Sequence, residues 1–106
     1  PGNDWIIIKL AKPGIIEEIE LDTAHFKGNY PDKASISAGY FNEDTKVNSI
    51  IKNIKDWKEI LPPTKLKADK IHRFKKIIHN KKANFIKLDI YPDGGVSRLR
   101  VFGKFN

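Results

Sequence analysis

Apolar and polar residues alternate along much of this chain with the period of two that is typical of half-buried β-strands. The clearest case is FIKLDIY at residues 85–91, where every second residue is Ile or Leu. The apolar pattern resumes at residues 96–102, with a break of step at Ser97 that we interpret as a bulge. The intervening Pro-Asp-Gly-Gly segment favours a chain reversal, because proline ends a ladder and glycine tolerates positive φ. We therefore expect a β-hairpin over residues 85–102.

Further strands are predicted in the first forty residues. The run WIIIKL at residues 5–10 is almost continuously apolar, which is typical of a buried strand, and its tryptophan is expected to be a core aromatic. A turn is expected at Lys12-Pro13-Gly14, followed by a strand at residues 15–23 whose acidic residues form the solvated face. The stretch ASISAGY at residues 34–40 predicts another strand, with Ala, Ile and Tyr facing the core and both serines facing solvent.

In the middle of the chain, the pattern of apolar residues distinguishes less clearly between helix and strand. A short helix inserted between strands fits residues 42–54, whose apolar residues have helical spacing: Val47, Ile50, Ile51 and Ile54. Residues 57–61 fit a helix or a short strand, which Pro62-Pro63 is expected to end. Residues 65–84 show a helical stripe of apolar residues and fit a strand poorly. Several short strands without long alternating helices predict an all-β, antiparallel β-sandwich, as a single domain over residues 1–106.

Composition and charge narrow the classes of function. The net charge of +7 comes mostly from 17 lysines, against three arginines. The densest basic run, residues 65–82, has a single aromatic residue on which a base would stack, so we favour a solvated lysine face and do not expect a nucleic-acid partner. The lack of cysteine excludes disulfides and thiolate metal sites and suits a reducing compartment. No apolar run is long enough for a membrane span, and the histidine spacing matches no metal motif, so we expect no membrane partner, metal or cofactor.

Two clusters of residues carry candidate chemistry. The first is DTAHFKGNYP at residues 22–31, which Gly and Pro mark as a loop. Asp22 lies within reach of His25 and would set the tautomer of its imidazole. The alternative is a structural turn in which Asp22 and Asn29 bond local backbone amides.

The second cluster is the pair Arg98 and Arg100, which are two residues apart and so share one face of the predicted strand, opposite Leu99 and Val101. Two neighbouring guanidinium groups offer paired donors to a carboxylate. The alternative is two solvated arginines at a sheet edge.

The two blocks together resemble the signature stretches of the allantoicase family. DTAHFKGNYP at residues 22–31 and LDIYPDGGVSRLRVFG at residues 88–103 are similar to one allantoicase repeat, in the same order and at a similar separation. WIIIKLAKPGIIEEIELDT and WKEILPPTKL resemble the segments before and between the blocks. Two lysine- and asparagine-rich stretches, residues 42–53 and 75–84, fall outside the match and look like local expansions.

The resemblance implies a galactose-binding-like jelly roll and the hydrolysis of allantoate to ureidoglycolate and urea in purine degradation. Members of the family carry two such repeats per chain and form oligomers. The expected partners are therefore allantoate, as a small-molecule substrate, and further copies of the chain, in the cytoplasm and without a cofactor. The alternative is a non-catalytic jelly-roll module that binds a carbohydrate or a protein.

By the same resemblance, we expect three catalytic residues and four substrate-binding residues. His25 is the first choice as acid or base and Arg98 as the carboxylate-binding residue. The resemblance implies that the chain holds one repeat, begins part-way through it and lacks the arginine-containing stretch that family members have upstream, so we expect this fragment alone to be inactive. The expected catalytic residues are His25, Asp22 and Asp93, and the expected substrate-binding residues are Asn29, Arg98, Arg100 and Tyr91.

Overall fold

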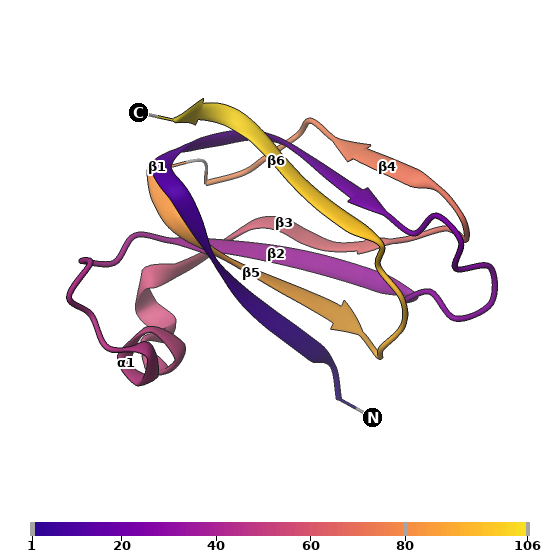
Figure 1. The fold of residues 1–106 in the computed structure, drawn as a ribbon, viewed down its shortest axis with the longest axis horizontal. Helices are drawn as coiled ribbons and strands as arrows, with labels where there is room; N and C mark the ends of the chain where they lie inside the picture. The colour runs from indigo at the N-terminus through magenta and orange to yellow at the C-terminus, as the bar shows by residue number, and fades with distance from the viewer. Residues whose placement is uncertain (1, 80, 106) are drawn as a thin grey trace.

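A computed structural model describes residues 2–79 and 81–105 of the chain. Within these residues it contains antiparallel strands, one short α-helix and one 3₁₀ helix (Figure 1). In chain order they are β1 (Asp4–Asp22), β2 (Lys33–Gly39), α1 (Val47–Lys52), η1 (Ile54–Asp56), β3 (Trp57–Lys65), β4 (Ile71–Phe74), β5 (Ala83–Tyr91) and β6 (Arg98–Phe105). No helix in this part of the chain is long and apolar enough to cross a membrane.

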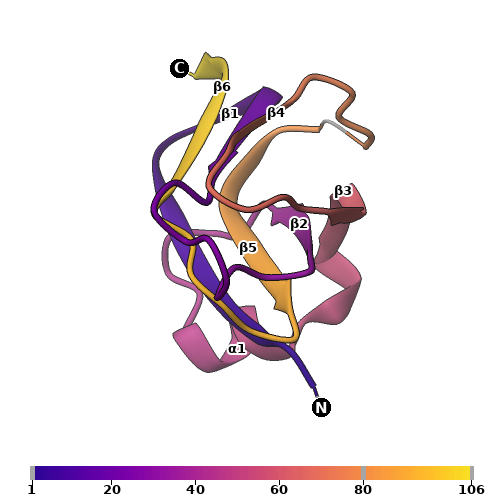
Figure 2. The same cartoon turned by 90° about the vertical axis from the view of Figure 1, so that its right-hand side faces the viewer.

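The long strand β1 is bent, and its two halves belong to different layers (Figures 1 and 2). Its first half pairs with β5, with Asp4 opposite Ile90. Its second half pairs with β6 and, at its end, with β4, so that Asp22 lies opposite both Arg98 and Ile71. One layer therefore has the order β3-β2-β5-β1, and the other consists of β4, the second half of β1 and β6. This arrangement confirms the predicted antiparallel β-sandwich.

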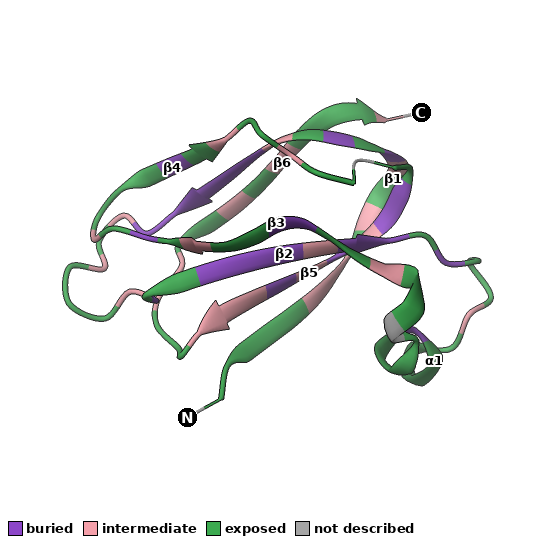
Figure 3. Ribbon diagram, turned by 180° about the vertical axis from the view of Figure 1, so that it is seen from behind, coloured by how far each residue is buried: buried purple, intermediate pink, exposed green. Residues whose placement is uncertain are grey.

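The core is built mainly from aliphatic side chains. Buried positions lie on strands of both layers (Figure 3). Each fully buried Ile or Leu contributes about 1.5–3 kcal/mol to the free energy of unfolding. β2 is buried on both faces, so Ser35 is buried although its place in the alternation predicted exposure. The large aliphatic side chains that are most completely buried are those of Ile16, Ile19, Leu21, Ile36, Ile60, Leu66 and Ile86.

β5 and β6 do not form the predicted hairpin. In the described part of the chain, β5 pairs with β1 and β2, whereas β6 pairs with β1. The connection at residues 92–97 therefore crosses from one layer to the other (Figure 1). The alternation identified both strands, but it could not distinguish neighbours in one sheet from strands that face the same core from opposite sides.

The expected turn at Lys12-Pro13-Gly14 is a bend within β1, which continues through it. The ladder with β5 shifts register between Lys9 and Gly14. Gly14 pairs with both β5 and β6 at the point where the strand changes layers. A Cβ atom there would lie 2.3 Å from the carbonyl oxygen of Lys104, so glycine is needed for this close approach.

The predicted positions of two aromatic residues are wrong. Trp5 is 49% exposed and Tyr40 is 51% exposed, so neither belongs to the core. Each ring instead contacts a lysine, with Lys87 Nζ 5.1 Å from the centre of Trp5 and Lys82 Nζ 5.5 Å from that of Tyr40.

The middle of the chain resolves into one short helix and two strands. The expected inserted helix is α1, although the side chain of Ile54 is outside the described residues. β3 passes through Pro62-Pro63, contrary to prediction, because β3 is the edge strand of its layer and prolines are tolerated there. The helical stripe predicted within residues 65–84 is also wrong, since β4 at Ile71–Phe74 pairs with the end of β1.

Replacing Asn84 with alanine should destabilise the fold. Its buried side chain accepts a hydrogen bond from Phe41 N (2.9 Å) and donates one to Phe41 O (2.7 Å). Asn84→Ala would leave both backbone groups unsatisfied, so we expect the free energy of unfolding, measured with urea, to fall by about 2–4 kcal/mol. The exposed Asn48 provides the control, since Asn48→Ala should change it by less than about 0.5 kcal/mol. Equal effects of the two substitutions would contradict this role of Asn84.

Candidate functional site

The two sequence blocks meet at one end of the sandwich, the end that Figure 2 faces. The loop between β1 and β2 and the connection between β5 and β6 are joined by backbone hydrogen bonds. Gly95 N donates to Asn29 O (2.6 Å), and Ser97 N donates to Asp22 O (2.8 Å). Asp32 N donates to Tyr91 O (2.9 Å). Segments about seventy residues apart in sequence thus form one unit, which we call the loop junction.

The two glycines of the connection are required by packing at the loop junction. Gly94 has a φ of 136° and lies so close to the backbone of Tyr30 and Pro31 that a Cβ atom would be 2.5 Å from Pro31 N. A Cβ atom on Gly95 would lie 2.1 Å from the ring of Phe26. The Asp-Gly-Gly segment is therefore explained by contact with the other block, and not by a tight hairpin turn.

Asp22 and Thr23, at the end of β1, have structural partners. The Asp22 carboxylate accepts a hydrogen bond from Ala24 N (2.7 Å), which is the local turn weighed as an alternative to catalysis. Thr23 is fully buried, and its hydroxyl donates to Lys67 O (2.7 Å) and accepts from Lys70 N (3.1 Å). Thr23 was not predicted as a site residue, and it fixes the β3–β4 loop against the loop that carries His25.

His25 has an unusual backbone conformation, with a φ of 74°. Its backbone N–H donates to Asp69 Oδ1 (2.8 Å), in the loop that Thr23 also holds. Its side chain is exposed, and its ring makes no hydrogen bond with any residue that the structure describes. A non-glycine residue in this region costs free energy and persists where surrounding contacts impose it, which is common at functional sites.

Asn29 and Asp93 line a common hollow of about 340 Å³ at the loop junction. It lies between the two loops, and the polar side chains among its lining residues are those of Asn29, Tyr30, Asp32 and Asp93. His25, Arg98 and Tyr91 do not line it. The complete lining is Gly28, Asn29, Tyr30, Asp32, Pro92, Asp93 and Gly94.

Tyr91 is partly buried at the end of β5. Its hydroxyl lies 3.1 Å from Ser35 Oγ, which gives it a partner within the fold. The structure therefore provides a packing role for this residue.

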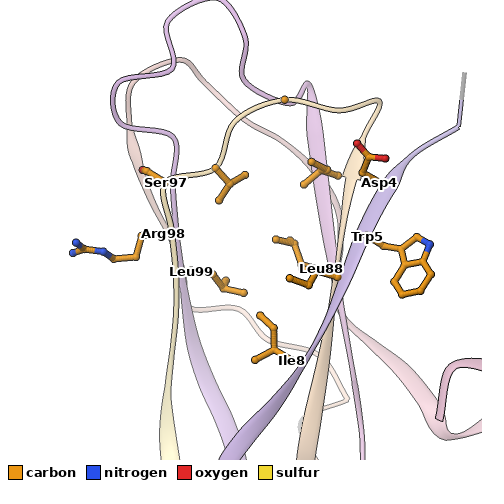
Figure 4. Close-up of a pocket in the computed structure, with 11 residues that line it drawn as sticks. Asp4, Trp5, Ile8, Leu88, Ser97, Arg98 and Leu99 are labelled. Atoms are coloured by element: carbon orange, nitrogen blue, oxygen red, sulfur yellow. The ribbon is translucent and has the colours of Figure 1, made fainter. Parts of the chain in front are cut away.

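Arg98 and Arg100 lie on the outer face of β6, as their spacing predicted. Arg98 points away from the interior, whereas Leu99 points into it (Figure 4). Arg98 is opposite Asp22 in the ladder, and Arg100 is opposite Glu20.

Glu20 corrects the prediction of a solvated acidic face on β1. It is only 5% exposed, because β4 and β6 flank it on both sides. Its carboxylate is 3.3 Å from Arg100 Nη1 and 3.4 Å from Arg73 Nε. Sequence reasoning missed Glu20 and Arg73, because the pairing that brings Arg73 opposite Glu20 has no signal in the local pattern.

An apolar hollow of about 430 Å³ opens between the layers at the same end (Figure 4). Ile8 and Leu88 from one layer and Leu99 from the other point into it. Gly94 borders both this hollow and the one that Asn29 and Asp93 line.

The structure thus brings the predicted residues to one half of the molecule, but in different settings. Asn29 and Asp93 share a hollow, Arg98 and Arg100 share an outer face, and Asp22 and Tyr91 have structural partners. His25 is exposed on the loop that leaves β1 three residues after the position opposite Arg98. Within the described residues, no group of three or more His, Asp or Glu side chains is placed to hold a metal ion.

Comparison with known proteins identifies the family. The model of the allantoicase repeat matches residues 1–106. The chain is 48% identical over 104 residues to "Probable allantoicase 1" of Burkholderia mallei, covering 97% of this chain and 31% of that protein. The chain belongs to the allantoicase family. It spans about a third of the length of the curated allantoicases that it matches.

Solved structures confirm that this allantoicase repeat has the predicted galactose-binding-like jelly-roll fold. The allantoicase of Saccharomyces cerevisiae superposes with a TM-score of 0.78 at 33% identity, over 97% of this chain and 28% of that one. The CBM32 protein CpGH89CBM32-6 of Clostridium perfringens superposes with a TM-score of 0.62 at 17% identity, over 98% of this chain and 71% of that one. At this low identity, the likeness to the CBM32 protein concerns the fold alone.

Substitution of Gly95 should loosen the loop junction of this allantoicase repeat. Gly95→Ala places a methyl group against the ring of Phe26, so we expect the free energy of unfolding to fall by about 1–3 kcal/mol. A Cβ atom on Gly28, in the same region, meets nothing within 4 Å, so Gly28→Ala should be neutral or slightly stabilising. Urea unfolding of both variants, and of Gly95→Ala combined with Phe26→Leu, tests this contact. A double variant no more stable than Gly95→Ala would contradict it.

Proposed function

We propose that this chain is one repeat of an active allantoicase, and that the polypeptide in which it occurs hydrolyses allantoate to ureidoglycolate and urea. The observation that carries the proposal is the match to the allantoicase repeat along the whole chain, which includes both blocks of the loop junction. The names of the curated relatives agree with this activity. Since the chain spans about a third of those proteins, the complete site would include residues from the remaining part.

The reaction sets clear chemical requirements. Allantoate has a carboxylate and two ureido groups on one carbon atom. Hydrolysis breaks one bond from this carbon to a ureido nitrogen, adds a hydroxyl group from water to the carbon, and leaves the water proton on the departing urea. The site therefore needs a cation for the carboxylate, polar partners for the ureido groups, and a group that can accept and donate a proton.

Residues near the loop junction match these requirements. The imidazole of His25 is exposed and would move the proton, while the guanidinium of Arg98 would bind the carboxylate as a two-pronged donor. The Asn29 amide would pair with a ureido group, and Asp93 would orient water or the second ureido group across the same hollow. We assign Asp22 to positioning this loop, through its bond to Ala24 N, and Tyr91 to packing against Ser35 beneath it.

Arg100 is a supporting residue in this proposal. Glu20 already engages one of its donor groups, and Arg73 engages the other oxygen of Glu20. This arrangement holds Arg100 beside Arg98 and adds positive charge to the face on which Arg98 lies. The proposed setting is a cytoplasmic homo-oligomer, which agrees with the lack of cysteine and with the need for further protein segments around the site.

His25→Asn separates catalysis from folding. Asparagine tolerates the left-handed conformation that residue 25 adopts, so the free energy of unfolding should change by less than about 0.5 kcal/mol. Loss of the imidazole should lower the rate at which the polypeptide that contains this repeat releases urea from allantoate by about 10²–10⁴-fold. Lys27→Ala, in the same loop, is the control and should keep the rate of the unmodified protein. A His25→Asn variant that folds and releases urea at the normal rate would exclude His25 as the acid or base.

Arg98→Lys tests the carboxylate-binding role. The substitution keeps the positive charge but removes the two-pronged donor, so kcat/KM for allantoate should fall by about tenfold or more. Lys104→Ala, further along β6 and exposed, should leave kcat/KM unchanged. Normal kinetics of Arg98→Lys would contradict the assignment.

A thermal-shift comparison tests the non-catalytic, carbohydrate-binding alternative. That alternative would replace this proposal if the polypeptide released no urea, and if a simple sugar raised its midpoint of thermal unfolding while allantoate did not.

A further inference from the structure

A basic hollow lies at the end of the sandwich opposite the loop junction. It measures about 220 Å³ and is formed by the end of β2, the segment η1 with the start of β3, and the residues just before β5. The pairing of Gly39 with both Trp57 and Phe85 fixes these segments side by side at this end, on the left in Figure 1. The side chains that carry charge or polarity around it are Tyr40, Lys55, Asp56, Lys58, His79, Lys81 and Lys82.

The charges around this hollow are unbalanced. Four lysines face it against one carboxylate, that of Asp56. In the described part of the chain, none of these four lysines has an ion pair within 4.0 Å. Ammonium groups that gather around a concave surface repel one another and raise the local concentration of anions, since the low-dielectric walls focus their field. The hollow therefore has the electrostatic character of an anion site.

The residue types around the hollow favour phosphate over carboxylate. All three arginines of the chain, with their two-pronged donors, lie elsewhere: Arg73, Arg98 and Arg100 are on the outer face of β4 and β6. Lysine is a compact, strongly hydrated charge that binds phosphoryl oxygens without a planar match. The imidazole of His79 is held at the rim, with Nδ1 3.1 Å from Glu59 O. Tyr40 is exposed, and the ammonium of Lys82 lies over its ring, 5.5 Å from the ring centre.

The size and composition of the hollow indicate a small ligand. Its volume is below the range typical of sites for drug-sized molecules, so it suits one or two phosphoryl groups. Apart from the imidazole of His79, its lining has one aromatic ring, that of Tyr40, whereas single-stranded nucleic acid is bound along a groove with several stacking platforms. His79, Lys81 and Lys82 belong to the lysine- and asparagine-rich stretch at residues 75–84, to which the proposed hydrolysis assigns no role.

We propose that this hollow binds a small phosphate anion, inorganic phosphate or diphosphate, through Lys55, Lys58, Lys81 and Lys82. Neither the carboxylate of allantoate nor any residue of the loop junction takes part. The inference is therefore independent of the proposed hydrolysis, and either can fail without the other.

Calorimetric titration of the 106-residue chain with sodium diphosphate tests the proposal, at an ionic strength held constant with sodium chloride. We expect saturable binding of one diphosphate per chain and a higher midpoint of thermal unfolding in its presence. Lys58→Gln combined with Lys82→Gln should weaken this binding by about tenfold or more, because two charge-assisted contacts are lost. Lys12→Gln combined with Lys104→Gln makes the same change in net charge at exposed positions outside the hollow and should preserve the affinity.

Four results would overturn the inference. The first is no heat of binding, and the second is an effect of diphosphate on unfolding that sodium chloride reproduces at the same ionic strength. The third is an equal loss of affinity in the two double variants. The fourth is binding of a single-stranded oligonucleotide, with affinity that falls steeply with salt, in the absence of diphosphate binding. His25→Asn should leave diphosphate binding intact, which keeps this result separate from the test of hydrolysis.

Discussion

Backbone hydrogen bonding of β1 in both layers is the constraint on which the rest of this structure depends. The strand changes layers where its backbone passes closely against β6 at Gly14, and it then returns toward the end from which it started. The start and the end of β1 are therefore close to the two ends of the connection at residues 92–97, since Asp4 pairs with Ile90 and Asp22 with Arg98. The loop junction follows from this geometry, because the connection can cross between the layers only beside the loop that leaves β1.

Two surfaces with different chemistry lie far apart on this sandwich. The three arginines lie on the outer face of β4 and β6, where Glu20 holds two of them in place. The four lysines of the basic hollow lie at the other end and have no such partner among the described residues. The buried carboxylate of Glu20 fixes the geometry of Arg73 and Arg100, on the face that also carries Arg98, whereas ammonium groups without a carboxylate partner adapt to a compact and highly charged anion.

Much of the fold could be predicted from the sequence, and the errors have physical causes. Alternation located β5 and most of β6, but local pattern has no information on pairing, so the crossing between layers was predicted as a hairpin. The carboxylate of Glu20 was expected in solvent because its burial depends on the flanking strands β4 and β6, both more than fifty residues away in sequence. The candidate site was found through its two sequence blocks. The strained backbone of His25 and the supporting roles of Thr23 and Asp69 depend on contacts between loops and required the structure.

The path of β1 also determines when this domain can fold during its synthesis on the ribosome. The second half of β1 contains Ile16, Ile19 and Leu21, which are among the most buried side chains, and its main partner is β6. Translation produces these residues about eighty positions before Arg98. Until residues 98–105 have left the exit tunnel, an apolar strand with unpaired backbone groups stays available to other chains. The nascent chain therefore exposes a pairing edge of its own core to other chains until its last strand is complete.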